Sequence, residues 1–415
     1  MNTSTYHERR KRFYEAIPDF WHDLYGEEYA LFDLSMATRK EIEDIHQATD
    51  RIGQVFFKVC SLMRKVPDST LLEMGFPSET LSFLRLKTLP VESVISRLDL
   101  VHDGSTYKCI EINADTPTFI KELFSINRLV VQEFQANDPN EGVEKKLGDA
   151  VRTSILQAKK WLGKDHPYLV FTAHEDHVED RNTVLYLKEL SGYSSQFVPL
   201  HKLEIKRGEG LFDDQGQRID ILYRQTFPIE TLLLDADEQG NDIGIWLLEL
   251  VQSKQLAIIN PPSAFLLQNK AIQAVIWSLH EEDHPFFSEK EHEWIEEYFL
   301  PTYLEPDVFI EKGLPFVKKP AFGREGDTVE IYNQSGQLTL KDSQESYSDY
   351  LQVYQQYVEL PLVTFQSEKG VQEGFQLIGS FLLNGKPGAF GYRVGDRITN
   401  NLSYYLPIGI QKEGP

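Results

Sequence analysis

Cysteine is scarce in this sequence, whose 415 residues contain only Cys60 and Cys109. Two cysteines cannot build a disulfide framework or a four-thiolate zinc site. Neither lies in a recognisable nucleophile signature, so we expect both to be buried apolar residues. Low cysteine use is typical of a reducing compartment, and we therefore expect a cytoplasmic protein.

Long hydrophobic runs and positive charge are also lacking. No stretch reaches the roughly 18 uncharged apolar residues of a transmembrane helix, and the basic residues near the N-terminus precede no apolar segment, so neither a membrane span nor a signal peptide is expected. The formal net charge is -22. This balance disfavours nucleic-acid binding, which needs a basic face. It would favour a cationic substrate such as a polyamine, although it also serves solubility alone.

The sequence does contain enough apolar material for two or three closely associated domains. Hydrophobic residues make up 41% and aromatic residues 12%, more than a disordered chain carries. The periodicity predicts mixed α/β and α+β structure. We divide the chain into a helical N-terminal segment with a hairpin (1–120), an α/β domain (121–262) and a last region (263–415). Beyond Pro301 this last region is expected to form a separate antiparallel α+β unit.

Two further patterns in the last region predict helices. Residues 264–282 are typical of one amphipathic helix, with Lys270 in QNKA near its start. Tyr347, Tyr350, Tyr354 and Tyr357 also recur at helical spacing, and packing in a core or a lid is the simplest interpretation.

A glycine-rich loop lies within KKPAFGREGDTV, residues 318–329. An apolar strand ends with a lysine, and Gly323, Arg324 and Gly326 follow. Glycines let backbone N–H groups approach phosphate oxygens, and a lysine adds a point charge. The sequence fits neither a Walker loop nor a dinucleotide fingerprint. A plain β-hairpin turn is the alternative interpretation.

A third pattern lies in SRLDLVHDGSTYKCIEINADTPT, residues 96–118, where an Asp-Gly turn separates two short apolar runs. A period of two places Arg97 and Asp99 on one strand face, and Glu111 and Asn113 on one face of the next strand. Two carboxylates, an amide and a guanidinium then converge. Oxygen ligands of this kind suit Mg²⁺. A solvated or salt-bridged hairpin is the alternative.

Together these motifs resemble the glutathionylspermidine synthetase and trypanothione synthetase family, an ATP-grasp variant with a preceding α/β domain. The resemblance spans about residues 15–407. It rests on the R-x-D, DG and E-x-NADTPT hairpin, on the Lys-Pro-glycine loop, and on Lys270, 49 residues before Lys319. It also includes EDRNT-x-x-YL at 179–187 and RVGDRITNNLSYYLP at 393–407.

The resemblance implies an ATP-grasp fold in which 121–262 is a substrate domain and 263–415 holds the nucleotide-binding and lid region. The residues that it implies as Mg²⁺ ligands are Asp99, Glu111 and Asn113. The implied nucleotide-binding residues are Lys270, Lys319, Gly323, Arg324 and Gly326. Lys319 is preferred over Lys318 because it stands directly before Pro320, and Lys318 should point to the opposite sheet face.

The resemblance also implies roles at the reacting groups. The implied catalytic residues are Arg97, Arg324 and Arg393. The implied substrate-binding residues are Arg97 and Thr116 on the acyl side and Glu179 or Asp180 on the amine side.

The activity implied is that of an ATP- and Mg²⁺-dependent ligase that joins a carboxylate to an amine through an acylphosphate. The expected partners are a small acid, such as a glutathione-like peptide or an amino acid, and a polyamine or another amine. The chain is expected to be a monomer or a homodimer. It resembles the acid–amine ligase type that lacks a cysteine amidase domain, so amidase activity is not expected.

The C-terminal motif differs from the family pattern, because Pro407 is followed by Ile408 where the family usually continues through Phe-Pro-His. The substrate pair is therefore open. The alternatives are a catalytically silent ATP-binding protein with the same fold and an ATP-grasp kinase.

Overall fold

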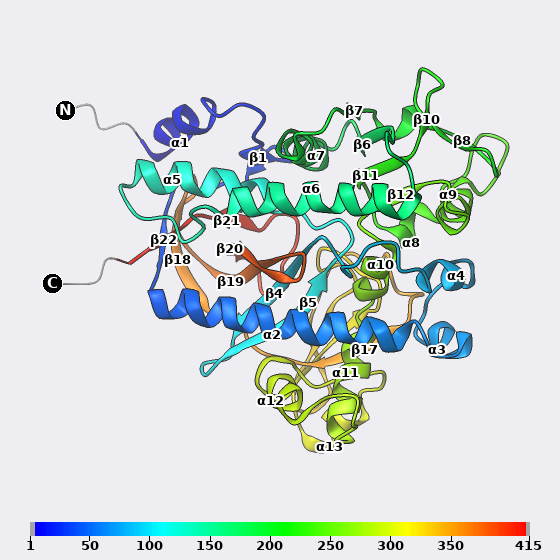
Figure 1. The fold of residues 1–415 in the computed structure, drawn as a ribbon. Helices are drawn as coiled ribbons and strands as arrows, with labels where there is room; N and C mark the ends of the chain where they lie inside the picture. Colours follow the sequence, from blue (N-terminus) through cyan, green and yellow to red (C-terminus); the bar gives the residue numbers. More distant parts are fainter. Residues whose placement is uncertain (1–4, 412–415) are drawn as a thin grey trace.

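The structure is a computed structural model that describes residues 5–411. Residues 1–4 and 412–415, the outer ends of the first and last predicted segments, lie outside the described residues. Figure 1 shows the two long helices, α2 and α6, on either side of strands from both the early and the late parts of the chain.

The N-terminal segment is largely helical, as predicted. Its longest helix, α2 (Arg39–Met63), begins at Thr38, whose hydroxyl accepts the Glu41 N–H while the Glu41 carboxylate accepts the Thr38 N–H. Apolar side chains at three- and four-residue steps of α2 are buried against the sheet. The other elements are α1 (Tyr6–Tyr14), α3 (Asp68–Glu73), a 3₁₀ turn (Ser78–Thr80), α4 (Leu81–Leu84), β1 (Asp23–Leu24), β2 (Glu27–Glu28) and β3 (Ser35–Ala37).

The central sheet is antiparallel and joins the two ends of the chain in the order β21-β20-β19-β4-β5, with β18 also pairing with β19. The predicted hairpin is confirmed at the Asp103-Gly104 turn, and a second hairpin turns at Asn384-Gly385, where the two residues have left-handed φ of 50° and 77°. The strands are β4 (Ile95–His102), β5 (Tyr107–Asn113), β18 (Leu362–Ser367), β19 (Gly370–Leu383), β20 (Lys386–Gly395) and β21 (Tyr404–Leu406).

Pairing between β4 and β19 shows that the antiparallel region beyond residue 301 is not separate, contrary to our expectation. Arg97 lies opposite Phe381, and Asp99 lies opposite Gly379. Successive side chains of β19 point to opposite faces of the sheet and pack in different apolar clusters. Phe381 packs in one cluster, and Leu382 packs against α2 in the other. The divisions at residues 120 and 262 remain predictions.

The middle of the chain forms the predicted α/β sheet, which is parallel and has the order β12-β11-β6-β7. Its strands are β6 (Leu169–Ala173), β7 (Gln196–Phe197), β11 (Ile221–Gln225) and β12 (Ala257–Ile259). Strand order reverses between β6 and β11, the place where open α/β sheets bind ligands at the carboxyl ends of their strands. The chain between β7 and β11 forms a small separate sheet of β8 (Glu204–Lys206), β9 (Gly210–Phe212) and β10 (Arg218–Ile219).

The helices of this middle part include α6, which contacts both the parallel sheet and the central sheet (Figure 1). They are a π-helical turn (Glu122–Ile126), α5 (Asn127–Glu133), α6 (Val143–Leu162), α7 (Val178–Ser191), a 3₁₀ turn (Leu200–Lys202), α8 (Ile229–Leu232) and α9 (Ile243–Gln252). Gly192 ends α7 in the left-handed conformation, as predicted.

The last part contains a second antiparallel sheet with the order β13-β17-β14-β15-β16. Its strands are β13 (Thr302–Tyr303), β14 (Phe316–Pro320), β15 (Glu330–Tyr332), β16 (Leu338–Lys341) and β17 (Gln352–Gln356), and β22 (Ile408–Ile410) pairs with β3. The helices are α10 (Pro262–Gln268), α11 (Ala271–Glu281), α12 (Glu289–Tyr298) and α13 (Asp307–Lys312).

Two helix predictions in this part are wrong. The helix expected at 264–282 is broken between α10 and α11, because Asn269 turns to an extended backbone and donates to the Met74 carbonyl at 2.8 Å. The four tyrosines do not lie on one helix. Tyr354 lies on strand β17, whose backbone pairs with both β13 and β14.

A buried ion pair ties the parallel sheet to the end of the β4–β5 hairpin. Arg224 of β11 and Asp115 form a close ion pair, and both side chains are 1% exposed. Asp115 also accepts the Ile229 N–H at 3.2 Å.

Among the described residues, every helix is too short or too polar to be a candidate membrane span.

Replacement of Asp115 by Asn should destabilise the protein strongly, because it leaves the Arg224 charge buried without its partner. We expect the free energy of unfolding to fall by about 3–5 kcal/mol in denaturant titrations. The exposed pair Arg207–Glu249, at 2.8 Å, provides the control. Glu249→Gln should change the same quantity by about 1 kcal/mol or less, and equal effects of the two variants would contradict the prediction.

Candidate active site

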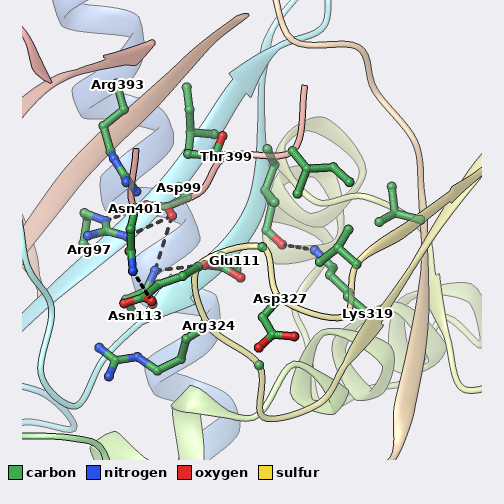
Figure 2. Close-up of a pocket in the computed structure, with 18 of the residues that line it drawn as sticks. Arg97, Asp99, Glu111, Asn113, Lys319, Arg324, Asp327, Arg393, Thr399 and Asn401 are labelled. Carbon is green, nitrogen blue, oxygen red and sulfur yellow. Dashed lines mark hydrogen bonds and ion pairs between the residues drawn. The ribbon is translucent and has the colours of Figure 1, made fainter. Parts of the chain in front are cut away.

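A single cleft collects twelve of the thirteen predicted site residues (Figure 2). It is lined by the central sheet, by the second antiparallel sheet with its glycine loop, and by Glu179 of α7. The predicted residues that line it are Arg97, Asp99, Glu111, Asn113, Thr116, Glu179, Lys270, Lys319, Gly323, Arg324, Gly326 and Arg393. Asp180 is not among the residues that line the cleft.

The hairpin places its polar side chains as the period-two pattern predicted. Asp99 and Glu111 lie directly opposite each other on β4 and β5. Arg97 donates to both Asp99 oxygens, from Nε at 2.7 Å and from Nη2 at 3.1 Å. The Asn113 amide donates to Glu111 at 3.1 Å and to Asp99 at 3.4 Å. The hairpin therefore contains a buried ion pair within the cleft rather than a solvated one.

Two lysines from distant segments flank Glu111. Lys270 Nζ lies 3.2 Å from Glu111 Oε2 and donates to the Gly323 carbonyl at 2.7 Å. Lys319 Nζ donates to Gln355 Oε1 at 2.7 Å and to the Ile110 carbonyl at 3.1 Å. Burial alone would raise the pKa of Glu111, but Lys270 and Lys319 outweigh burial and hold its pKa at about 2. Glu111 is thus a carboxylate at neutral pH.

The adjacent lysines of β14 point to opposite sheet faces, as predicted. Lys318 pairs with Glu330 at 3.1 Å, whereas Lys319 lines the cleft and is 5% exposed. Burial lowers the pKa of Lys319, the Glu111 carboxylate raises it, and the charge of Lys270 lowers it further. The result is a pKa of about 8. Lys319 therefore titrates close to physiological pH.

The chemistry of the donor set at the hairpin fits Mg²⁺. Asp99, Glu111 and Asn113 offer carboxylate and amide oxygens within one interconnected cluster, and Mg²⁺ favours oxygen ligands while keeping several waters. Within residues 5–411, no three His, Cys, Asp or Glu side chains group as a metal site. Asp99 is shared with Arg97, whose Nε lies 2.7 Å from Asp99 Oδ1.

Two loops meet above the cleft. The glycine loop, residues 321–329, follows β14, and the C-terminal loop, residues 396–401, follows β20. Gly326 has φ of 78°, and a Cβ there would lie 2.7 Å from the Thr399 carbonyl oxygen. Asn401 donates to the Glu325 carboxylate in a close contact. A side chain at position 326 would therefore separate the two loops.

The predicted amine-side carboxylates occupy different environments. Glu179, in the first turn of α7, lines the cleft, and burial followed by the charges of Glu122 and Asp180 raises its pKa to about 8. Asp180 is 6% exposed and lies behind the cleft, where His177 approaches it at 3.1 Å and Gln225 donates to it at 3.4 Å. The open choice between these residues thus favours Glu179 as the one that faces the cleft.

Several lining residues were not predicted. Gln355 holds Lys319 and is itself held by Gln273 and by Thr302, each at 3.1 Å. No sequence pattern distinguishes such a glutamine from any other on a strand. Arg397, four residues after Arg393, lies in the quoted C-terminal motif, which could have indicated it. The other unpredicted polar side chains that line the cleft include Tyr25, Tyr29, Glu325, Asp327, Thr399 and Asn401.

The sheets and the cleft between them define an ATP-grasp-type fold. The chain belongs to the glutathionylspermidine synthase preATP-grasp family, whose family model matches residues 3–411. It is similar to a protein of Haemophilus influenzae named "Putative acid--amine ligase", with 27% identity over 328 residues that cover 75% of this chain and 73% of that protein.

Similarity to a solved structure concerns the fold alone. A glutathione synthetase-like effector from Globodera pallida, solved in its apo form, matches with a TM-score of 0.55 and 13% identity. The match covers 98% of both chains. The predicted family and fold class are therefore confirmed.

Gly326→Ala should loosen the contact between the two loops. Gly336 is the matched control, because its φ of 71° imposes similar backbone strain while a Cβ there meets nothing closer than Ile310 at 3.7 Å. Each substitution should lower the free energy of unfolding by about 1 kcal/mol, because alanine is strained in the left-handed backbone conformation. Only Gly326→Ala should speed amide hydrogen exchange in residues 396–401, and equal exchange in both variants would contradict the loop contact.

Proposed function

We propose that the protein is an ATP-dependent ligase that joins a carboxylate to an amine through an acylphosphate. The observation that carries this proposal is the charge of the cleft. The chain has a net charge of -22. Six cationic side chains nevertheless line the cleft, namely Arg97, Lys270, Lys319, Arg324, Arg393 and Arg397, and they outnumber the five acidic ones there, Asp99, Glu111, Glu179, Glu325 and Asp327. Such a concentration suits a polyanion such as a nucleoside triphosphate. The family match and the name of the Haemophilus relative support the ligase assignment.

The triphosphate would lie between the glycine loop and the hairpin. Lys270 already bridges these two elements through Gly323 and Glu111, and Lys319 lies on the same side of the cleft. Both ammonium groups can neutralise phosphate oxygens, and the backbone of the glycine loop can approach them closely. Asp99, Glu111 and Asn113 would hold Mg²⁺, which supplies charge neutralisation at the phosphates when bound.

The reaction needs no protein nucleophile. An oxygen of the substrate carboxylate bonds to the γ-phosphorus of ATP, the bond to the β–γ bridging oxygen breaks, and ADP leaves. The amine nitrogen then bonds to the acyl carbon, the bond from that carbon to the phosphate oxygen breaks, and inorganic phosphate leaves. The nitrogen gives up its proton and an amide remains. Arg97 and Arg393 would hold the anionic carboxylate and the tetrahedral intermediate.

Glu179 is suited to the amine. An alkylammonium group that arrives beside it would lower the pKa of Glu179, pair with its carboxylate and transfer one proton to it before the nitrogen attacks. The second proton would leave with the phosphate. Its pKa of about 8 makes it a stronger base than an ordinary carboxylate. The acid substrate would be a glutathione-like peptide or an amino acid bound near Arg97 and Thr116. The amine would be a polyamine or another cationic amine, which the acidic surface of the chain favours.

The decisive experiment measures ADP release and product mass with Mg-ATP against amino acids, thiol peptides and polyamines. A ligase should release ADP only when an acid and an amine are both present, and should yield a product that is lighter than the two substrates together by one water. ADP release that needs no amine and a phosphorylated acceptor would indicate a kinase. Absence of any ADP release across the panel, with ATP still bound, would indicate a silent protein.

Glu111→Gln should reduce this turnover by about 10²-fold or more, since it removes a charged oxygen from the proposed Mg²⁺ site while keeping the side-chain shape. Glu330→Gln is the matched control. Glu330 also pairs with a lysine at 3.1 Å, but on the opposite face of β14. It should keep turnover within about twofold, and both variants must be shown to be folded at the assay temperature, because Glu111→Gln leaves the buried Lys270 charge without its partner. Full activity of Glu111→Gln would refute the metal assignment.

The specificity constant for ATP should fall as pH rises through about 8, because Lys319 then loses the charge that would meet the phosphates. The measurement is kcat/KM for ATP against pH, which reports groups of the free enzyme. Lys319→Arg should move the decline to higher pH, since a guanidinium stays protonated. Lys318→Arg, the control on the opposite face, should leave it unchanged. A decline at the wild-type pH in Lys319→Arg would assign it to another group.

A further inference from the structure

Gln225 is the last residue of β11, at the edge where strand order reverses between β6 and β11. Its side chain is 3% exposed. It does not line the cleft, so it cannot touch a substrate there in this conformation. Nothing in the proposed mechanism uses it.

The side-chain amide of Gln225 joins two segments that are far apart in sequence. Nε2 donates to the Thr116 carbonyl at 3.2 Å and to the Pro117 carbonyl at 3.1 Å. It also donates to Asp180 Oδ1 at 3.4 Å. A glutamine amide has two hydrogens, so these three acceptors share both of them. Both N–H hydrogens of this buried amide are therefore used in bonds to the Thr116–Pro117 segment and to Asp180.

The two joined segments carry opposite halves of the proposed reaction. The loop from Thr116 continues to Thr118, whose carbonyl accepts from Arg97 Nη1 at 3.2 Å, so it belongs to the acyl side. Asp180 directly follows Glu179 in the first turn of α7, so it belongs to the amine side. Gln225 therefore sets where the amine-side carboxylate lies relative to the acyl-side arginine.

Two other buried amides hold the same loop without reaching the amine side. Gln268 Oε1 accepts the Ala114 N–H at 2.9 Å and the Asp115 N–H at 3.3 Å. Asn260 Nδ2 donates to the carbonyls of Ala114 and Asp115. Neither contacts α7 through a hydrogen bond recorded among the described residues. The loop is thus held at several points, and Gln225 makes the connection to α7.

We propose that Gln225 is a positioning residue that fixes the amine-binding carboxylate against the acyl-binding loop, an inference that rests on the proposed ligase function. The cationic amine would pair with Glu179 while its nitrogen reaches the acyl carbon, so a displaced Glu179 would weaken binding of the amine in the productive position. Loss of Gln225 should therefore impair use of the amine and spare formation of the acylphosphate.

The first test needs no substrate and compares hydrogen exchange in the full chain carrying Gln225→Met or Gln268→Met. Both changes keep side-chain length and remove the amide. Gln225→Met should speed exchange in residues 115–118 and in residues 178–181, by about tenfold in each. Gln268→Met should speed exchange in the loop alone. Unchanged exchange in residues 178–181 of Gln225→Met would overturn the connection.

The second test separates the two half-reactions, with glutathione and spermidine as the probe pair. Positional isotope exchange in ATP with glutathione alone reports acylphosphate formation, and full turnover reports use of the amine. Gln225→Met should leave the isotope exchange within about twofold and raise the KM for spermidine about tenfold. Gln268→Met should change both in proportion. The proposal would be overturned if Gln225→Met reduced isotope exchange and full turnover to the same extent, or if it left the KM for spermidine unchanged.

A double-mutant cycle shows whether Gln225 acts through Asp180. In the Asp180→Asn background, Gln225→Met should raise the KM for spermidine by less than about threefold, because the partner carboxylate has already gone. Additive effects would refute this route. If the wild-type protein shows no acid-dependent chemistry with ATP, the proposed function fails, and the hydrogen exchange still decides whether Gln225 joins the two segments.

Discussion

The site depends on a buried lysine that joins three distant parts of the chain. The Lys270 ammonium lies 3.2 Å from Glu111 of the hairpin and donates to the Gly323 carbonyl of the glycine loop, while its own backbone N–H donates to Ala321 at 2.9 Å. Burial of an ammonium is costly unless it is paired and hydrogen-bonded, and here each requirement is met by a different segment. The residue can occupy this place only because α10 and α11 are broken at Asn269. An unbroken helix would have satisfied the Lys270 N–H internally.

Local sequence patterns predicted the parts of the site that are local in the fold. The Asp-Gly turn indicated a hairpin, and strand alternation placed Asp99 and Glu111 where they could face each other. Their pairing also depends on a bulge between Asp99 and Leu100, which the sequence did not indicate. Strand alternation likewise distinguished Lys319 from Lys318. The break between α10 and α11 could not be predicted in this way. Its cause is a hydrogen bond from Asn269 to the distant Met74 carbonyl, and helical periodicity continues through it.

The remaining failures have the same origin in long-range pairing. The contact between β4 and β19 joins residues near position 99 to residues near position 379, and no periodicity within either strand indicates its partner. The tyrosines from 347 to 357 had helical spacing, yet Tyr354 lies on a strand because β17 completes a sheet between β13 and β14. Gln225 and Gln355 were missed because an amide that orients another residue carries no motif of its own. Family resemblance supplied Arg393 and Glu179, which no local pattern indicated.

The chain as a whole is acidic, whereas cationic side chains gather in the cleft. The acidic surface of the chain favours the approach of a cation, whereas a nucleoside triphosphate needs the six cationic side chains of the cleft. The structure separates the two requirements in space. Lys270 and Lys319 lie beside the hairpin and the glycine loop, while Glu179 faces the cleft from the end of the parallel sheet, where neighbouring carboxylates and burial raise its pKa. The reacting carboxylate would lie between them, within reach of Arg97. In the proposed mechanism, the buried Gln225 amide at the end of β11 would link Asp180, beside Glu179, to the loop next to that arginine.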